Sequence, residues 1–185
     1  GLFVCCMFCH GELTRLRPGP RYLTTFYLMV SVGGALGALL VGIAAPKLLS
    51  GYYELGITLT VCAVLLYYRT LSAQWWVAGA TLAVVVATAT FTVTNIGDYL
   101  ANTRVKMRNF YGVVRTRDYP APVPFRVMFH GGINHGGQLL DPALRGQPTS
   151  YFAPSSGYGR AFASLPDGPR RVGVLGLGAG AIAAY

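Results

Sequence analysis

The glycine-rich run at residues 172–180, with the letters VGVLGLGAG, has the clearest potential for chemistry in this sequence. Residues 172–175 form an apolar stretch that is typical of a parallel strand buried on both faces. Gly176, Gly178 and Gly180 follow at alternate positions, and glycine lets the backbone approach a ligand closely and open a helix N-terminus. The pattern predicts a strand, a turn and a helix start that together bind a nucleotide-type cofactor.

A second glycine-rich segment carries two histidines and a glutamine. His130 and His135 flank the letters GGIN, and Gly136 lies shortly before Gln138. A metal site would need a third ligand at compatible spacing, for which Asp141 is a weak candidate. We expect a loop that folds over a ligand, with purely structural turns and a metal site as the alternatives. The sequence contains no GxSxG nucleophile elbow, so it does not predict a Ser-His-acid triad.

Cysteines cluster near the first residue. Cys6, Cys9 and His10 satisfy the C-x-x-C-H pattern of covalent haem attachment, and Cys5 lies beside them. The apolar surroundings favour packing at a helix end, with haem attachment and a metal or redox role as alternatives. Cys62 lies within another apolar stretch, where a thiol behaves as a small hydrophobic group. The four cysteines do not resemble a disulfide framework.

The elements that must position these groups divide into a very apolar part and a more polar part. Apolar residues make up 53% of the chain and charged residues only 11%, far below the roughly 25% usual for soluble domains. The ranges 22–45 and 75–97 carry no charge, and each is long enough to span a bilayer as a helix. We expect a third span over residues 48–69, with Glu54 near its start, and the end of a further span in residues 1–9.

Lipid is the partner that the composition predicts most directly. The net charge of +9 fits lysine and arginine side chains that meet anionic lipid headgroups. No alternation of aromatic and basic residues outside the membrane flanks predicts nucleic-acid binding. Basic residues near the span ends favour slightly the side that carries Lys47 and residues 104–115, which we place in the cytoplasm. Gly33 and Gly37 have the spacing of a close helix contact, within one bundle or in an oligomer.

After residue 98 the pattern changes to that of a small soluble domain. Residues 109–117 and 125–129 read as strands, and the proline-rich segment 118–124 predicts a hairpin with a long loop. The glycines of residues 131–137 indicate irregular backbone. Residues 155–165 predict a short helix that opens with a serine cap.

Segments along nearly the whole chain form one further pattern: CHGEL at 9–13, FYLM at 26–29, RNFYGVVR at 108–115, HGGINHGGQ at 130–138, YFAPSSG at 151–157 and VGVLGLGAG at 172–180. This pattern resembles the membrane-fused spermidine synthase-like proteins of the polyamine aminopropyltransferase family. The resemblance implies an α-helical transmembrane bundle, then a β-hairpin region, then the start of an α/β Rossmann-like domain of the S-adenosylmethionine-dependent transferase type. The corresponding divisions are transmembrane helices at 1–98, a β-hairpin and gate-loop region at 99–168, and a first strand and glycine turn at 169–185.

The resemblance also implies roles for single residues. Gln138 corresponds to a Gly-x-x-Gln element that contacts decarboxylated S-adenosylmethionine, the co-substrate of the family. Tyr151 would line the polyamine pocket. The glycine turn, with Gly176, Gly178 and Gly180, would face the nucleoside and aminopropyl portion. No metal is implied.

The sequence departs from the family around Tyr151. The soluble enzymes carry an Asp-Glu pair before this tyrosine and a Glu soon after it, whereas residues 147–150 and 152–154 contain no acid. A pocket that selects polyamines needs carboxylates at their positive charges. In this part of the sequence only Asp141 and Asp167 are available for that role. Cofactor binding is therefore better supported than selection of a polyamine.

Three functions stay open. The first is a membrane-anchored aminopropyltransferase that acts on a small amine. The second is a methyltransferase or dinucleotide enzyme, because Gly176, Gly178 and Ala181 also fit the dinucleotide fingerprint. The third is a non-catalytic membrane subunit of a larger complex.

We expect the chain to be an internal piece of a longer protein in the bacterial inner membrane, with its soluble part in the cytoplasm. It starts at Gly1 rather than at an initiator methionine, and it reaches Tyr185 within the glycine turn. The resemblance places the catalytic acid beyond residue 185, so the piece alone is not expected to be active.

Overall fold

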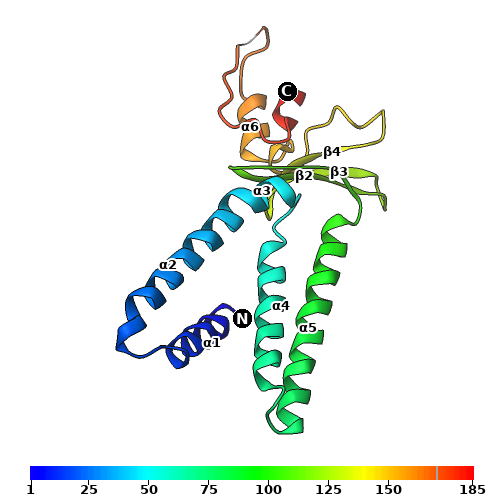
Figure 1. The fold of residues 1–185 in the computed structure, drawn as a ribbon. Helices are drawn as coiled ribbons and strands as arrows, with labels where there is room; N and C mark the ends of the chain where they lie inside the picture. Colours follow the sequence, from blue (N-terminus) through cyan, green and yellow to red (C-terminus); the bar gives the residue numbers. More distant parts are fainter. Residues whose placement is uncertain (170) are drawn as a thin grey trace. The chain divides into compact units, whose positions relative to one another are not determined.

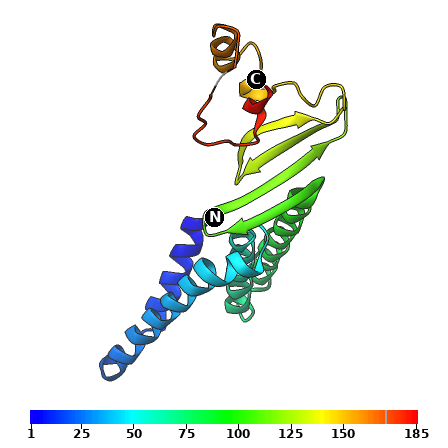
Figure 2. The ribbon, with the colours of Figure 1, turned by 90° about the horizontal axis from the view of Figure 1, so that it is seen from above.

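A computed structural model describes residues 1–169 and 171–185 of the chain. Its contacts divide into two compact units, Gly1–Leu100 and Ala101–Tyr185. The first unit is helical and the second contains a four-stranded sheet (Figures 1 and 2).

The first unit consists of helices joined by short connections (Figure 1). The α-helices are α1 (Leu2–Arg15), α2 (Leu23–Leu39), α3 (Ala45–Leu48), α4 (Glu54–Thr70) and α5 (Trp75–Leu100), with a 3-10 turn at Pro20–Tyr22 before α2 and a π-helical turn at Leu40–Ala44 that leads from α2 into α3.

Two helical stretches have the length and apolar composition of membrane spans. Pro20–Leu48 has a mean hydropathy of 2.2 and Trp75–Leu100 of 1.8, each with 6% of its most apolar window buried. They contain the uncharged ranges 22–45 and 75–97 that the sequence singles out. An apolar, exposed surface of this length is what a bilayer can cover.

The third span expected at residues 48–69 is not among the helices of membrane length found in the described residues. The backbone leaves the helix at Leu49, which is extended, and α4 begins only at Glu54. Gly51 lies in this break, where a Cβ atom would lie 2.7 Å from the ring of Tyr53. The resulting helix of 17 residues is about 25 Å long, slightly short of a hydrocarbon core of roughly 30 Å.

Helix α1 is longer than predicted, since it continues past Cys9 to Arg15. Two ion pairs stabilise its last turn. Glu12 Oε2 lies 2.9 Å from Nη2 of Arg15 and 3.0 Å from Nε of Arg69 on α4. The sequence predicted only residues 1–9 as the end of a span, and these short-range and cross-helix charges favour the additional turns.

Helices α4 and α5 form an antiparallel pair (Figure 1). Hydroxyl groups join them at two levels, at 3.2 Å between Oγ1 of Thr60 and Thr92 and at 2.7 Å between Oγ1 of Thr70 and Thr81. Gly56 allows the close approach, because a Cβ atom there would lie 2.9 Å from the side chain of Thr92. Small residues and interhelical hydroxyl contacts are typical of helix pairs in membranes.

The glycine face of α2 has no neighbour within the described chain. A Cβ atom at Gly33 or Gly37 would meet nothing within 4 Å. The packing of this face inside one bundle, expected from the sequence, is therefore not seen in the described residues. Its use in an oligomer stays a prediction.

The sheet of the second unit is a simple antiparallel meander, in the order β1-β2-β3-β4 (Figure 2). Its strands are β1 (Thr103–Asn109), β2 (Gly112–Tyr119), β3 (Phe125–His130) and β4 (Ile133–Leu139).

The predicted hairpin is present as β2 and β3. The other two strands, β1 and β4, were not predicted. The range 109–117 contains a turn rather than one strand, because the side-chain oxygen of Asn109 accepts a hydrogen bond from the Tyr111 amide at 2.9 Å. The residues before this turn form β1. Gly136 and Gly137 belong to β4. The irregular backbone expected of the glycines is present as a register shift opposite Val127–Phe129 and as positive φ at Gly131 (60°) and Gly136 (97°).

The remaining elements are short helical segments that follow the sheet. They are two 3-10 turns, at Ser150–Phe152 and Ala181–Ala184, and helix α6 (Gly157–Ala163). The predicted serine cap is confirmed at Ser156, whose hydroxyl accepts a hydrogen bond from the Gly159 amide at 3.1 Å. Val113, Val127 and Phe152 are the buried apolar side chains of this unit among the described residues.

An ion pair joins β2 and β3 at directly paired positions. Nε and Nη2 of Arg126 lie 2.6 and 2.8 Å from the two carboxylate oxygens of Asp118. The hydrogen bonds from Arg126 lower the pKa of Asp118 below its usual value, and the charge of Arg104 adds to the effect. A lowered pKa stabilises the fold above the unfolded-state pKa of about 4, and this stabilisation is lost as the pH falls through the folded-state value.

We expect Asp118→Asn to lower the free energy of unfolding at pH 7 by about 0.5–1 kcal/mol, the range of a partly exposed pair. The variant should also lose part of the decrease in stability that the parent shows below about pH 4. Thermal unfolding of Asp118→Asn, Arg126→Gln and the double variant measures the coupling. Strictly additive effects would contradict the ion pair.

Candidate functional site

The glycine turn predicted to bind a cofactor lies against strand β4. Gly176, Gly178 and Gly180 all have positive φ, at 84°, 57° and 76°, a region that glycine adopts without strain. The amide of Ala179 donates a hydrogen bond of 3.1 Å to the carbonyl oxygen of His135. A Cβ atom on Gly178 would lie only 3.1 Å from that same oxygen. Glycine is therefore needed here for both the backbone angle and the contact.

The strand expected before this turn is not formed. Residues 172–175 have no regular structure, and Val172, Val174 and Leu175 are 53%, 41% and 104% exposed. A strand exists only when a neighbour satisfies its backbone groups, and the described sheet is an antiparallel meander without a parallel partner for this segment. The prediction of a buried parallel strand at 172–175 is wrong for this structure.

A hollow of about 270 Å³ lies between β4 and the glycine turn. It is lined by Gly137 and Gln138 of β4, by Arg145, Gly146 and Gln147 of the following loop, and by Ala179, Gly180, Ala181, Ala183 and Ala184. Two of the predicted cofactor-binding residues, Gln138 and Gly180, thus share one hollow although they are far apart in sequence.

Gln138 has a structural role beside its position in the hollow. Its side-chain amide donates a hydrogen bond of 3.1 Å to the carbonyl oxygen of Arg145, and the hydroxyl of Thr149 donates to the carbonyl of Gly137. The loop between them turns at Asp141, whose carboxylate accepts from the Ala143 amide at 2.8 Å. Gln138 therefore holds one wall of the hollow in place and leaves its carbonyl oxygen for other partners. No sequence signal had indicated Thr149 or Arg145.

Tyr151 lies next to Gly178 of the glycine turn. Its hydroxyl is 3.4 Å from the position that a Cβ atom of Gly178 would take, and its ring packs beside Phe152 with 4.5 Å between centroids. The side chain is 44% exposed and faces a shallow depression with Ser156 and Tyr158. The structure brings Tyr151 to Gly178, but does not place it in the hollow with Gln138. Gly176 lies apart, since its Cβ would meet nothing within 4 Å in the described chain.

Aromatic contacts fix the segment after the glycine turn. The hydroxyl of Tyr185 donates a hydrogen bond of 2.6 Å to the carbonyl oxygen of Phe152. The ring of Tyr185 stacks on Phe162 of α6, with centroids 4.8 Å apart and planes 5° from parallel. This support for the hollow was not predicted, because the sequence gives no indication of which aromatic rings meet.

Charge in the hollow does not favour a polycation. Arg145 is the one charged residue among the described residues that line it. The carboxylates of Asp118 and Asp141 are held by Arg126 and by the loop backbone. Such a lining suits an uncharged group, such as the hydroxyls of a nucleoside, or an anionic one.

The histidines do not form a metal site in the part of the chain that the structure describes. His130 and His135 lie 6.0 Å apart by ring centroid, and Nε2 of His130 is 3.2 Å from the carbonyl oxygen of Tyr111. No group of three or more His, Cys, Asp and Glu side chains that could hold a metal ion is found among residues 1–169 and 171–185. The same applies to Cys6, Cys9 and His10 on α1.

The cysteines of the helical unit are all free thiols. Cys5 and Cys9, one helical turn apart on α1, lie beside Cys62 of α4, and Cys6 is exposed. The sequence favoured packing at a helix end, but these contacts lie within α1 and α4, because α1 continues past Cys9 to Arg15.

Comparisons with known proteins do not add a family. No protein-family model, no curated protein and no solved structure matches this chain.

Proposed function

We propose that this chain belongs to a membrane-anchored, spermidine synthase-like protein that binds the uncharged nucleoside portion of an adenosyl-sulfonium co-substrate at the hollow between β4 and the glycine turn. The co-substrate would be decarboxylated S-adenosylmethionine, and the parent protein would transfer its aminopropyl group to a small amine. The soluble part would lie on the cytoplasmic side of a bacterial inner membrane, with the glycine turn as part of a Rossmann-like domain.

One observation carries the proposal. Gln138 and Gly180, which the resemblance assigns to the same ligand, line the same hollow. The backbone of the turn approaches β4 so closely that a Cβ atom at Gly178 would be in tight contact with the carbonyl oxygen of His135, at 3.1 Å. The two apolar helical stretches support the membrane part of the proposal by their length and composition.

The chemistry would be an in-line attack by a neutral amine on the carbon beside the sulfonium. The new C–N bond forms as the C–S bond breaks, and the sulfur keeps the electron pair as the thioether of methylthioadenosine. The attacking nitrogen loses its proton to a base. Such a reaction depends mainly on positioning and on removal of that proton.

A non-catalytic membrane subunit is the second candidate, and the charges favour it. No carboxylate is found beside Tyr151 or among the described residues that line the hollow. A pocket that selects a polyamine would need such groups.

Ligand-induced stabilisation of the purified chain in detergent can test the proposal. We expect methylthioadenosine and decarboxylated S-adenosylmethionine to raise the melting temperature, since a ligand that binds only the native state stabilises it. Gln138→Ala should weaken this binding by about 1–3 kcal/mol, because a buried polar group of the ligand would lose its partner.

Gln74→Ala, which removes the same amide from the helical unit, is the matched control and should bind like the parent. The melting temperature of each variant without ligand separates the loss of the Arg145 contact from the loss of binding. A parent chain that responds to neither compound, nor to S-adenosylmethionine or NAD, would favour the non-catalytic subunit.

A further inference from the structure

Three cysteine side chains meet where α1 packs against α4. Cys5 and Cys9 lie one helical turn apart on α1, and both thiols form side-chain hydrogen bonds with the thiol of Cys62 on α4. Cys6 is exposed, because successive residues of a helix are turned by about 100° from one another. None of these thiols belongs to the site proposed above, so their meeting needs an explanation of its own.

Contacts on either side of the thiols fix the register of α1 on α4. A Cβ atom at Gly1, directly before α1, would lie 3.5 Å from Cδ2 of Leu59. Farther along both helices, Oε2 of Glu12 lies 3.0 Å from Nε of Arg69. These contacts follow one another in the same order on the two helices, with the thiols between them. The approach of the thiols is therefore a consequence of how α1 and α4 pack.

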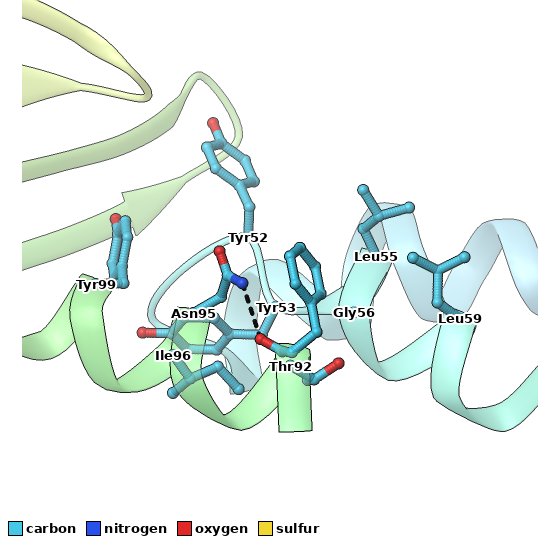
Figure 3. A pocket seen from close by; sticks show the side chains of 10 residues that line it. Tyr52, Tyr53, Leu55, Gly56, Leu59, Thr92, Asn95, Ile96 and Tyr99 are labelled. Atoms are coloured by element: carbon cyan, nitrogen blue, oxygen red, sulfur yellow. Dashed lines mark hydrogen bonds between the residues drawn. The ribbon is translucent and has the colours of Figure 1, made fainter. Parts of the chain in front are cut away.

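Helix α4 is held much more firmly to α5 than to α1. Its first turns line a hollow of about 240 Å³ with the end of α5, where Gly56 lies beside Thr92 (Figure 3). The hydroxyls of Thr60 and Thr70 join the pair further along. The ion pair between α1 and α4 is partly exposed, and such pairs contribute little stability. A covalent bond at the thiols would therefore change chiefly how firmly α1 is held.

The thiols differ in their access to a reagent. Cys9 is exposed and lies next to the polar residues that follow it on α1, whereas Cys62 is half-buried. Redox-sensitive cysteines are typically accessible thiols beside a second thiol that resolves the first oxidation product. Cys9 has the position of the thiol that reacts first, and Cys62 that of the resolving thiol.

We propose that Cys9 and Cys62 form a reversible disulfide that links α1 to α4 when the protein is exposed to a peroxide. This inference does not depend on the function proposed for the sheet unit.

The reaction takes place in two steps. The deprotonated thiol of Cys9 attacks one oxygen of the peroxide, the O–O bond breaks, and Cys9 becomes a sulfenic acid. The hydroxide that leaves takes up a proton to form water when the oxidant is hydrogen peroxide. The deprotonated thiol of Cys62 then attacks the sulfur of Cys9, the S–O bond breaks, and a second hydroxide leaves and becomes water. The two thiols lose two electrons and two protons in total, and a dithiol restores them by thiol–disulfide exchange as it becomes a disulfide itself.

Mass spectrometry of the full chain in nanodiscs of neutral lipid tests the proposal. The protein is treated with hydrogen peroxide, its remaining thiols are alkylated with N-ethylmaleimide, and it is digested without reduction. We expect a peptide pair joined through Cys9 and Cys62, which dithiothreitol separates. Hydrogen exchange of α1 should slow about tenfold or more in the oxidised protein, while α5 exchanges as before.

Cys6→Ser is the matched control, because Cys6 lies on the same helix and is exposed, and this variant should form the same bond as the parent. Cys62→Ser should form no bond, and Cys9 should then remain a sulfenic acid that dimedone labels. This positive signal separates the loss of the resolving thiol from a loss of fold.

Four results would overturn the proposal. They are a disulfide through Cys5 or Cys6 instead of Cys9, a disulfide between two chains, equal dimedone labelling of the parent and Cys62→Ser, and unchanged exchange of α1 in the disulfide-linked protein.

Discussion

Replacement of Gly137 by alanine should unfold the sheet. A Cβ atom at this position would lie 2.2 Å from the carbonyl oxygen of Arg126 and 2.8 Å from Cζ of Phe125. The carbonyl belongs to the backbone of β3, which pairs with β2 on its other side, so it cannot move without breaking a second ladder. We expect a loss of about 3 kcal/mol or more, above the usual cost of overpacking.

Hydrogen exchange of β3 and β4, followed by mass spectrometry, measures this effect. Gly132→Ala is the matched control, because Gly132 lies in the same hairpin and its Cβ would meet nothing within 4 Å of the described chain. The control should exchange like the parent, and α4 and α5 should stay protected in both variants. Retained protection of β3 and β4 in Gly137→Ala would show that the paired strands accommodate the Cβ atom at little cost, and would contradict the prediction.

This glycine illustrates how far the sequence could predict the sheet. The glycines of residues 131–137 indicated irregular backbone because glycine is uncommon within strands. In the structure position 137 lies within β4, and it is a glycine because the neighbouring strand leaves no room for a side chain there. This requirement for glycine depends on a contact with β3, and that contact cannot be predicted from the local sequence.

The membrane-length helices were predictable for the opposite reason. Their signal is a long uncharged range, which depends on composition alone and not on the identity of any neighbour. The end of α1 was placed incorrectly because it depends on a specific contact with another helix, the Glu12–Arg69 ion pair.

The candidate site was predictable in part. Positive φ at Gly176, Gly178 and Gly180 follows from the glycine pattern, and the shared hollow of Gln138 and Gly180 agrees with their common assignment. The hydrogen bonds of Gln138 and Thr149 to the backbone arise from tertiary structure. A strand at 172–175 was inferred from a run of apolar residues alone. Such a run does not show whether a neighbouring strand is present to pair with it, as a sheet requires.

Replacement of Gly178 by valine should release the glycine turn from β4. The backbone here has a φ of 57°, which is strained for a β-branched residue. The new Cβ would lie 3.1 Å from the carbonyl oxygen of His135, which accepts the Ala179 amide. The two effects act together, and we expect a local cost of about 2–4 kcal/mol.

Hydrogen exchange at Ala179 is the direct measurement, since its amide should exchange about 30-fold to 1,000-fold faster when the turn opens by that free energy. Gly173→Val is the matched control, because Gly173 lies in the same run, has no positive φ and would place its Cβ in open space. The control should leave Ala179 protected, and any stabilisation by methylthioadenosine should disappear only in Gly178→Val. Equal exchange at Ala179 in the two variants would mean that the turn does not depend on its contact with His135. The hollow would then lack the fixed wall that a nucleoside site requires.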